Sequence, residues 1–144
     1  MGQLFENDIL MVSVVAWALA QVSKMLIYLL REGEIKARYV TAAGGMPSSH
    51  SALVTALATR VGMQYGVNSG LFAVAAIFAA VVLYDAAGVR RAVSHQARII
   101  NRMLEEVIEY QRFNEKRLLE LLGHTPFEVF VGLLLGLVTA LSRG

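Results

Sequence analysis

Long runs of apolar residues, each broken by only a few polar positions, dominate the pattern of this chain. Four runs stand out, at residues 9–30, 49–65, 69–88 and 125–141. About 20 apolar helical residues are needed to cross the ~30 Å hydrocarbon core of a bilayer. Each run alone is also compatible with a core helix of a soluble protein, but a soluble chain of this size would not normally supply four. The pattern therefore predicts an all-α integral membrane bundle of about four transmembrane helices.

A different pattern occupies residues 90–110. Apolar side chains recur there at helical spacing, at Val93, Ala97, Ile100 and Leu104, while most charged residues fall on other faces. This spacing predicts an amphipathic helix that lies against the membrane or extends the third span.

Composition agrees with a membrane protein. Of the 144 residues, 56% are hydrophobic and 17% are charged, and the mean hydropathy is +0.55. Soluble domains usually carry about 25% charged residues. The length indicates a single domain, 1–144. The absence of cysteine excludes disulfides and thiolate metal sites, and a net charge of +2 is too small to indicate a nucleic acid partner.

Basic residues predict the orientation in the membrane. They concentrate in two connections, 31–47 and 90–120, which lie on the same side of a four-span bundle. Positively charged connections tend to stay cytoplasmic. We therefore expect both termini outside and the 90–110 helix in the cytoplasm.

Residues capable of chemistry gather at the predicted cytoplasmic ends of the spans. They are Lys24 and Arg31 on the first span, Gly45, Ser48, Ser49 and His50 before or at the start of the second, Asp85, Arg90 and Arg91 at the end of the third, and His124 and Glu128 at the start of the fourth. We expect these residues to form one site.

Two features of this set indicate an anion. Lys24 and Arg31 are seven residues apart, so they share one helix face. A glycine pair, Gly44 and Gly45, precedes a helix start, where free N–H groups and the helix dipole attract negative charge. The alternatives are that Lys24 extends its charge to the interface and that Ser48 simply caps a helix.

The second histidine of the set has a carboxylate beside it. His124 and Glu128 are four residues apart and stack on one helix face, so the carboxylate can fix the imidazole tautomer and prepare a nucleophile or base. Asp85 is a functional candidate because an acid within a span is costly to bury. Helix-start pairing for His124 and an ion pair of Asp85 with Arg90 or Arg91 are the structural alternatives.

These motifs resemble a known family. Pro47-Ser48-Ser49-His50 resembles the second signature of the type 2 phosphatidic acid phosphatase superfamily, which includes acid phosphatases and vanadium haloperoxidases. Lys24 and Arg31 reproduce the Lys-x6-Arg spacing of the first signature, and His124 with Glu128 resembles the His-x3-Asp of the third. The longer strings around them are similar to a small divergent branch of that superfamily, from about Lys24 to Gly136.

The resemblance implies a phosphatase that needs no metal. His124 would attack phosphorus, Glu128 would orient His124, and His50 would protonate the leaving oxygen and then activate water. Lys24, Arg31 and the Ser48 and Ser49 backbone would hold the phosphate oxygens, where fixed positive groups stabilise developing charge.

Four departures distinguish this chain from the superfamily pattern. Ser49 replaces the usual Gly, Glu128 replaces Asp, Glu32 replaces the Pro after the first-signature Arg, and Leu118 occupies the position of the third-signature Arg. Arg90 or Arg91 would take over the role of that missing arginine. A divalent cation bound by Asp85 and Glu128 is an alternative to the metal-free route.

The sequence thus predicts a membrane hydrolase of a lipid phosphate or diphosphate, such as a prenyl phosphate or a phosphatidate-like lipid, active at the cytoplasmic face. The alternative is a non-catalytic protein that binds anionic lipid headgroups or a partner through the same pocket. A thin four-helix bundle is also compatible with a homo-oligomer.

Overall fold

The computed structural model describes residues 5–33, 45–108 and 124–143, and this part of the chain consists of helices joined by short turns, with no strand. Five long helices follow one another: α2 (Asp8–Glu32), α4 (Ser49–Tyr65), α5 (Gly70–Ala87), α6 (Val89–Ile108) and α7 (Pro126–Leu141). Their bounds differ from the predicted ranges by no more than two residues at either end.

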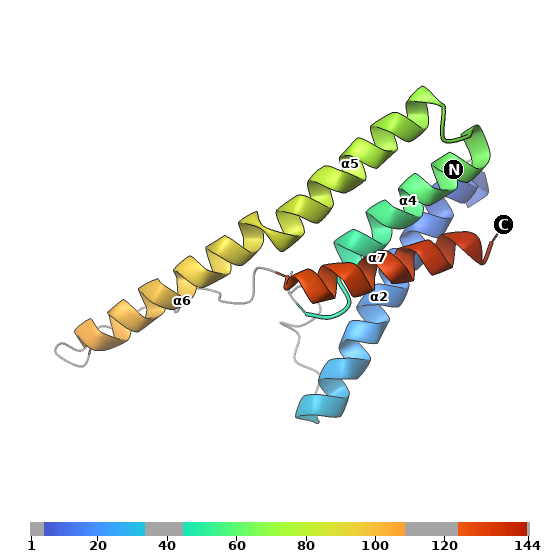
Figure 1. Cartoon of the computed structure of the whole chain (residues 1–144). Coiled ribbons are helices and arrows are strands. Elements are labelled where there is room, and N and C mark those ends of the chain that lie inside the picture. Colours follow the sequence, from blue (N-terminus) through green and yellow to red (C-terminus); the bar gives the residue numbers. More distant parts are fainter. Residues whose placement is uncertain (1–4, 34–44, 109–123, 144) are drawn as a thin grey trace.

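Helix α4 is the centre of the bundle. It packs against α2, α5 and α7, and α2 also packs against α7. Figure 1 shows the two chain ends together at one end of the molecule, while α6 continues from α5 as a long arm leading away from the bundle. Among the described helices, α6 contacts α5 alone.

Small side chains make the core. The fully buried cluster consists of Val12, Ala16, Ala20, Ala52, Ala56 and Ala140. Small residues allow helix backbones to approach closely, which is how helices associate within membranes. The core is therefore tightly packed although it contains little large apolar surface.

Two glycines of α7 bring it against α4. A Cβ atom on Gly132 would lie 2.3 Å from the carbonyl oxygen of Ser48, and one on Gly136 would lie 2.3 Å from that of Ala52. Any side chain at either position would push the helices apart. The Gly-x3-Gly spacing of Gly132 and Gly136 is the sequence signal for this contact.

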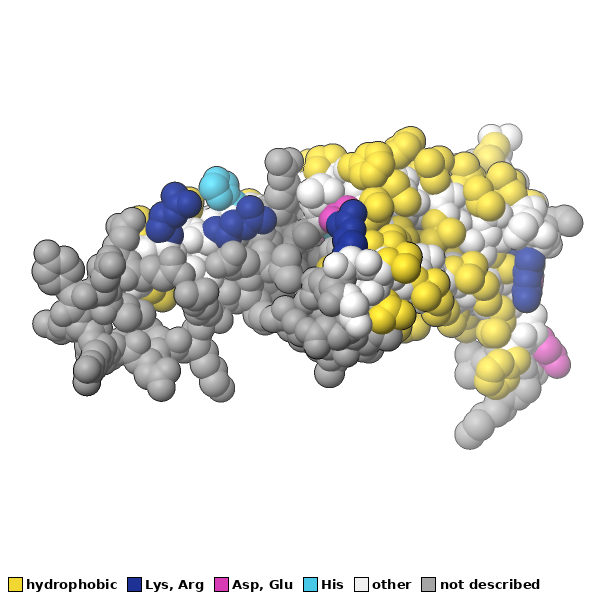
Figure 2. Space-filling model, turned by 90° about the horizontal axis from the view of Figure 1, so that it is seen from below, with side chains coloured by type: hydrophobic (Ala, Val, Ile, Leu, Met, Phe, Trp, Pro, Cys, Tyr) yellow, Lys and Arg dark blue, Asp and Glu magenta, His cyan; other side chains and the backbone are white. Residues whose placement is uncertain are grey.

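Large apolar side chains cover the outside instead. Trp17, Leu26, Ile77, Phe130 and Val138 are among many that are more than two-fifths exposed. Figure 2 shows hydrophobic side chains spread over the bundle, with charged groups at both ends of that surface. Contiguous apolar surface of this extent marks contact with a membrane or another protein.

Of the helices in the described part of the chain, two satisfy the length and apolarity needed to cross a bilayer: residues Asp8–Arg31 of α2 and Gly70–Ala87 of α5. The predicted count of about four transmembrane helices is not confirmed. Helix α7 is apolar but has 16 residues, and α4 has 17 residues and carries Arg60 with several hydroxyl side chains.

An ion pair closes the end of the bundle that lies opposite the predicted site. Arg60, near the end of α4, donates to the carboxylate of Asp8, the first residue of α2. The pair holds these two helix ends together.

Candidate active site

The helix starts of α4 and α7 meet. The N–H of Ser48 donates to the carbonyl oxygen of Glu128 over 3.1 Å. Ser48 is fully buried and is the N-cap of α4, because its Oγ accepts from the N–H of Ser51 at 3.3 Å. The hydroxyl of Ser51 lies 2.9 Å from the same oxygen. Two positive helix ends are thus placed side by side.

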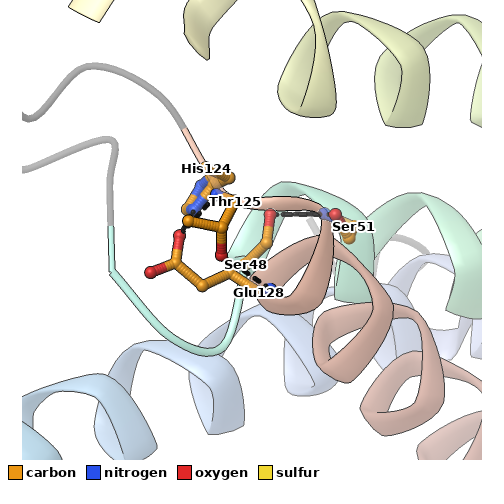
Figure 3. A network of polar contacts seen from close by, with 5 residues as sticks. All are labelled: Ser48, Ser51, His124, Thr125 and Glu128. Carbon is orange, nitrogen blue, oxygen red and sulfur yellow. Dashed lines mark hydrogen bonds and ion pairs between the residues drawn. The ribbon is translucent and has the colours of Figure 1, made fainter.

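His124 lies at this junction with 1% of its surface exposed. Its Nδ1 is 3.3 Å from Oε2 of Glu128, one turn further along. Figure 3 shows the imidazole and the carboxylate together at the start of α7, with Ser48 and Ser51 beside them. The four-residue spacing in the sequence predicted this pair.

The other imidazole nitrogen of His124, Nε2, is also buried. Among the residues that the structure describes, Nε2 has no hydrogen-bond partner. A carboxylate at Nδ1 favours the tautomer with the proton on Nδ1, which leaves a lone pair on Nε2. A buried polar atom of this kind requires an explanation, and a ligand is one.

Lys24 brings a positive charge into the same region. It extends the buried stripe of α2 that Val12, Ala16 and Ala20 form at four-residue spacing, and it is 1% exposed. Its ammonium interacts electrostatically with Glu128. Lys24 therefore points into the bundle and does not extend to the interface.

Gly45 packs against Tyr28, one turn beyond Lys24 on α2. Its φ is +94°, and a Cβ atom there would lie 2.6 Å from the Tyr28 hydroxyl oxygen. The segment before α4 thus passes close to the α2 face that carries Lys24, and only glycine fits at this position.

The remaining predicted residues differ in their exposure. Arg31 is exposed in the last turn of α2, and His50 is exposed in the first turn of α4. Ser49 is buried at the start of α4, and Asp85 is half-buried near the end of α5. Arg90 and Arg91 belong to the first turn of α6, and their side chains lie outside the described part of the structure, as does Leu118.

The sequence predicted that the Ser48 backbone would hold phosphate oxygens, but in the structure its N–H has another partner. The Ser48 N–H is already bonded to Glu128, so it links the two helices. Within residues 5–33, 45–108 and 124–143, no three acidic or histidine side chains gather in a way that could hold a metal ion. A cation site involving Asp85 and Glu128 stays a prediction.

Sequence reasoning missed Thr125, although its signal was present. Thr125 is the N-cap of α7, Pro126 follows at the first helical position, and Glu128 is the third residue of the helix. Thr-x-x-Glu is the pattern of a capping box, and proline is common directly after the cap.

Comparison with known proteins identifies the family of this chain. The chain is 43% identical to an uncharacterized membrane protein, YuiD, of Bacillus subtilis (strain 168), in an alignment of 153 positions that covers 96% of this chain and 95% of the relative. No solved structure gives a significant match. The profile of the divergent PAP2 family matches residues 5–139. This chain, with its buried His124 and its Pro-Ser-Ser-His helix start, belongs to the divergent PAP2 family.

Proposed function

We propose that this protein is a membrane phosphatase that hydrolyses a lipid phosphate or diphosphate through His124. The observation that carries the proposal is the state of the His124 imidazole. It is buried, Nδ1 is held by Glu128, and Nε2 has no partner among the described residues. A histidine arranged in this way is prepared for nucleophilic attack.

The surroundings favour a phosphate as the electrophile. The start of α4 and the start of α7 direct positive helix ends toward one region, and Lys24 adds a buried ammonium. Such ends are ready-made anion sites. Fixed positive groups also stabilise the charge that develops on the oxygens during phosphoryl transfer.

In the proposed reaction, Nε2 of His124 attacks phosphorus while the bond to the leaving oxygen breaks. His50 donates a proton to that oxygen and then accepts one from the water that cleaves the phosphohistidine. Glu128 stabilises the imidazolium form of the intermediate. His50 is exposed in the structure, so its side chain would turn toward the bound phosphate.

A lipid is the proposed substrate because the protein is embedded among lipids. We propose that α4 and α7 also cross the membrane beside α2 and α5, giving four spans with both termini outside. The site would then lie at the cytoplasmic leaflet. Phe127 and Phe130, exposed on α7 next to Glu128, would face the lipid chains there.

The test is phosphate release by purified protein from phosphatidate, a prenyl phosphate and a prenyl diphosphate, with p-nitrophenyl phosphate as a soluble comparison. We expect release from at least one lipid and loss of release in His124→Ala. His95→Ala, which changes an exposed histidine on α6, is the matched control and should keep full activity. EDTA should leave the rate unchanged if no metal takes part.

Equal phosphate release by wild type and His124→Ala across the panel would refute the proposal that this protein is a phosphatase that acts through His124. In that case the alternative is binding of anionic headgroups without turnover. Vesicle binding that is lost in Lys24→Met but retained in His124→Gln would support that alternative.

A further inference from the structure

Thr125 connects the start of α7 to the candidate nucleophile. It follows His124 directly and precedes Pro126, and its backbone is extended, with φ −72° and ψ 153°. A following proline favours this conformation. The Thr125 Oγ1 accepts from the N–H of Glu128 at 3.3 Å, and the Thr125 N–H donates to Glu128 Oε2 at 2.9 Å.

One carboxylate oxygen takes part in both the capping box and the pair with His124. Oε2 of Glu128 accepts from the Thr125 N–H and also lies 3.3 Å from Nδ1 of His124. The two reciprocal bonds with Thr125 hold the backbone and the side chain of Glu128 at once. A free glutamate side chain would lose rotamer freedom on being fixed, and the capping box fixes it before any substrate binds.

We propose that Thr125 is a positioning residue for His124. It acts through Glu128, whose oxygen it places at Nδ1, so that Nε2 is left as the nucleophilic atom. This inference rests on the proposed function for its catalytic consequence. The tautomer of His124 that it requires can be measured without turnover.

The same network accounts for the glutamate at position 128. A capping box places Glu or Gln at the third helical position. An aspartate there would be one methylene shorter, while the bonds to Thr125 and His124 both depend on the reach of the present side chain. Glu128→Asp should therefore be harmful here, although Asp is usual at this position in the superfamily that the motifs resemble.

The test compares three variants of the full-length protein. Thr125→Val removes the hydroxyl but keeps the shape, and Thr125→Ser restores an acceptor. Ser69→Ala is the matched control, because Ser69 caps α5 in the same way, accepting from the N–H of Phe72 at 3.1 Å, and it is not part of the candidate site. We expect kcat to fall about tenfold in Thr125→Val, which corresponds to about 1.4 kcal/mol, and to stay near the wild-type value in the other two.

A second readout is the ¹⁵N spectrum of the His124 imidazole. Wild type, Thr125→Ser and Ser69→Ala should show a proton on Nδ1, and Thr125→Val should show a mixture of tautomers. If Thr125→Val does not fold, Glu128→Asp should give the same mixture. An unchanged tautomer in the folded variant would overturn the proposal. If wild type has no phosphatase activity, the proposed function fails, and the spectra alone decide the role of Thr125.

Discussion

The N–H of Ser48 donates to the carbonyl oxygen of Glu128, and this bond joins the first turns of two helices that are far apart in the chain. Gly132 makes the approach possible, since a side chain there would meet the Ser48 carbonyl. The position of the candidate nucleophile thus depends on how closely α7 packs on α4.

Gly136→Ala should destabilise the protein. Its Cβ atom would lie 2.3 Å from the backbone oxygen of Ala52, so α4 and α7 must separate. Overpacking of this kind typically costs about 1–3 kcal/mol. Thermal unfolding in detergent should show a lower Tm. Gly70→Ala is the matched control, because nothing lies within 4 Å of the added atom, and a Tm drop of equal size in both variants would contradict the close packing.

Gly45→Ala should destabilise the segment before α4 for two reasons. The residue has a positive φ of +94°, and its new Cβ atom would lie 2.6 Å from the Tyr28 hydroxyl oxygen. Gly33→Ala measures the backbone effect separately, because Gly33 has a φ of +74° with nothing within 4 Å. That effect alone is about 1–2 kcal/mol.

Chemical denaturation of both variants separates the two contributions. We expect the loss of unfolding free energy to be larger for Gly45→Ala than for Gly33→Ala. Losses of equal size would mean that Tyr28 can move away freely and does not hold this segment.

Lys24→Met should reduce phosphate-ester hydrolysis more than Arg31→Met does. Lys24 is buried and interacts with Glu128, whereas Arg31 is exposed to solvent, which weakens its electrostatic effect. Removal of one preorganised stabilising group costs roughly a hundredfold in rate, so we expect a loss of that order in kcat/KM for Lys24→Met. Initial rates across substrate concentrations measure it, and equal losses in the two variants would argue against a buried charge at the site.

Single cysteines can test the proposed orientation, because the natural sequence contains none. Ser142→Cys places a thiol at the exposed end of α7, and His95→Cys places one on the exposed surface of α6. A membrane-impermeant maleimide should label the first in intact cells and the second only after the cells are opened. The reverse labelling pattern would invert the topology, and labelling of both in intact cells would mean that α7 does not cross the membrane between the two positions.

Local relationships were predictable from the sequence, and contacts between distant segments were not. The His124–Glu128 pair follows from a four-residue spacing, and helix bounds follow from apolar runs and their caps. The burial of Lys24 depends instead on which face of α2 meets the bundle, and the stripe from Val12 to Ala20 identifies that face. The number of spans could not be settled by apolarity, since α4 buries polar side chains against its neighbours.

The Asp8–Arg60 pair illustrates the same limit. Each residue lies at the end of a different helix, and a single sequence does not indicate that these two ends meet. The exposure of His50 was also not predictable from the sequence, because a shift of one residue along a helix turns the side-chain direction by about 100°. Side-chain direction near a helix start therefore needs coordinates.

The alanine and glycine core has a consequence for handling this protein. Alanine side chains remove little apolar area from water, and hydrophobic stabilisation scales with that area. In aqueous buffer the exposed leucines, valines and phenylalanines would gain more from aggregation than the bundle gains from its own interior. The surrounding lipid or detergent is thus part of what holds the helices in place, and unfolding measurements on this chain will report on the choice of amphiphile as well as on the substitution.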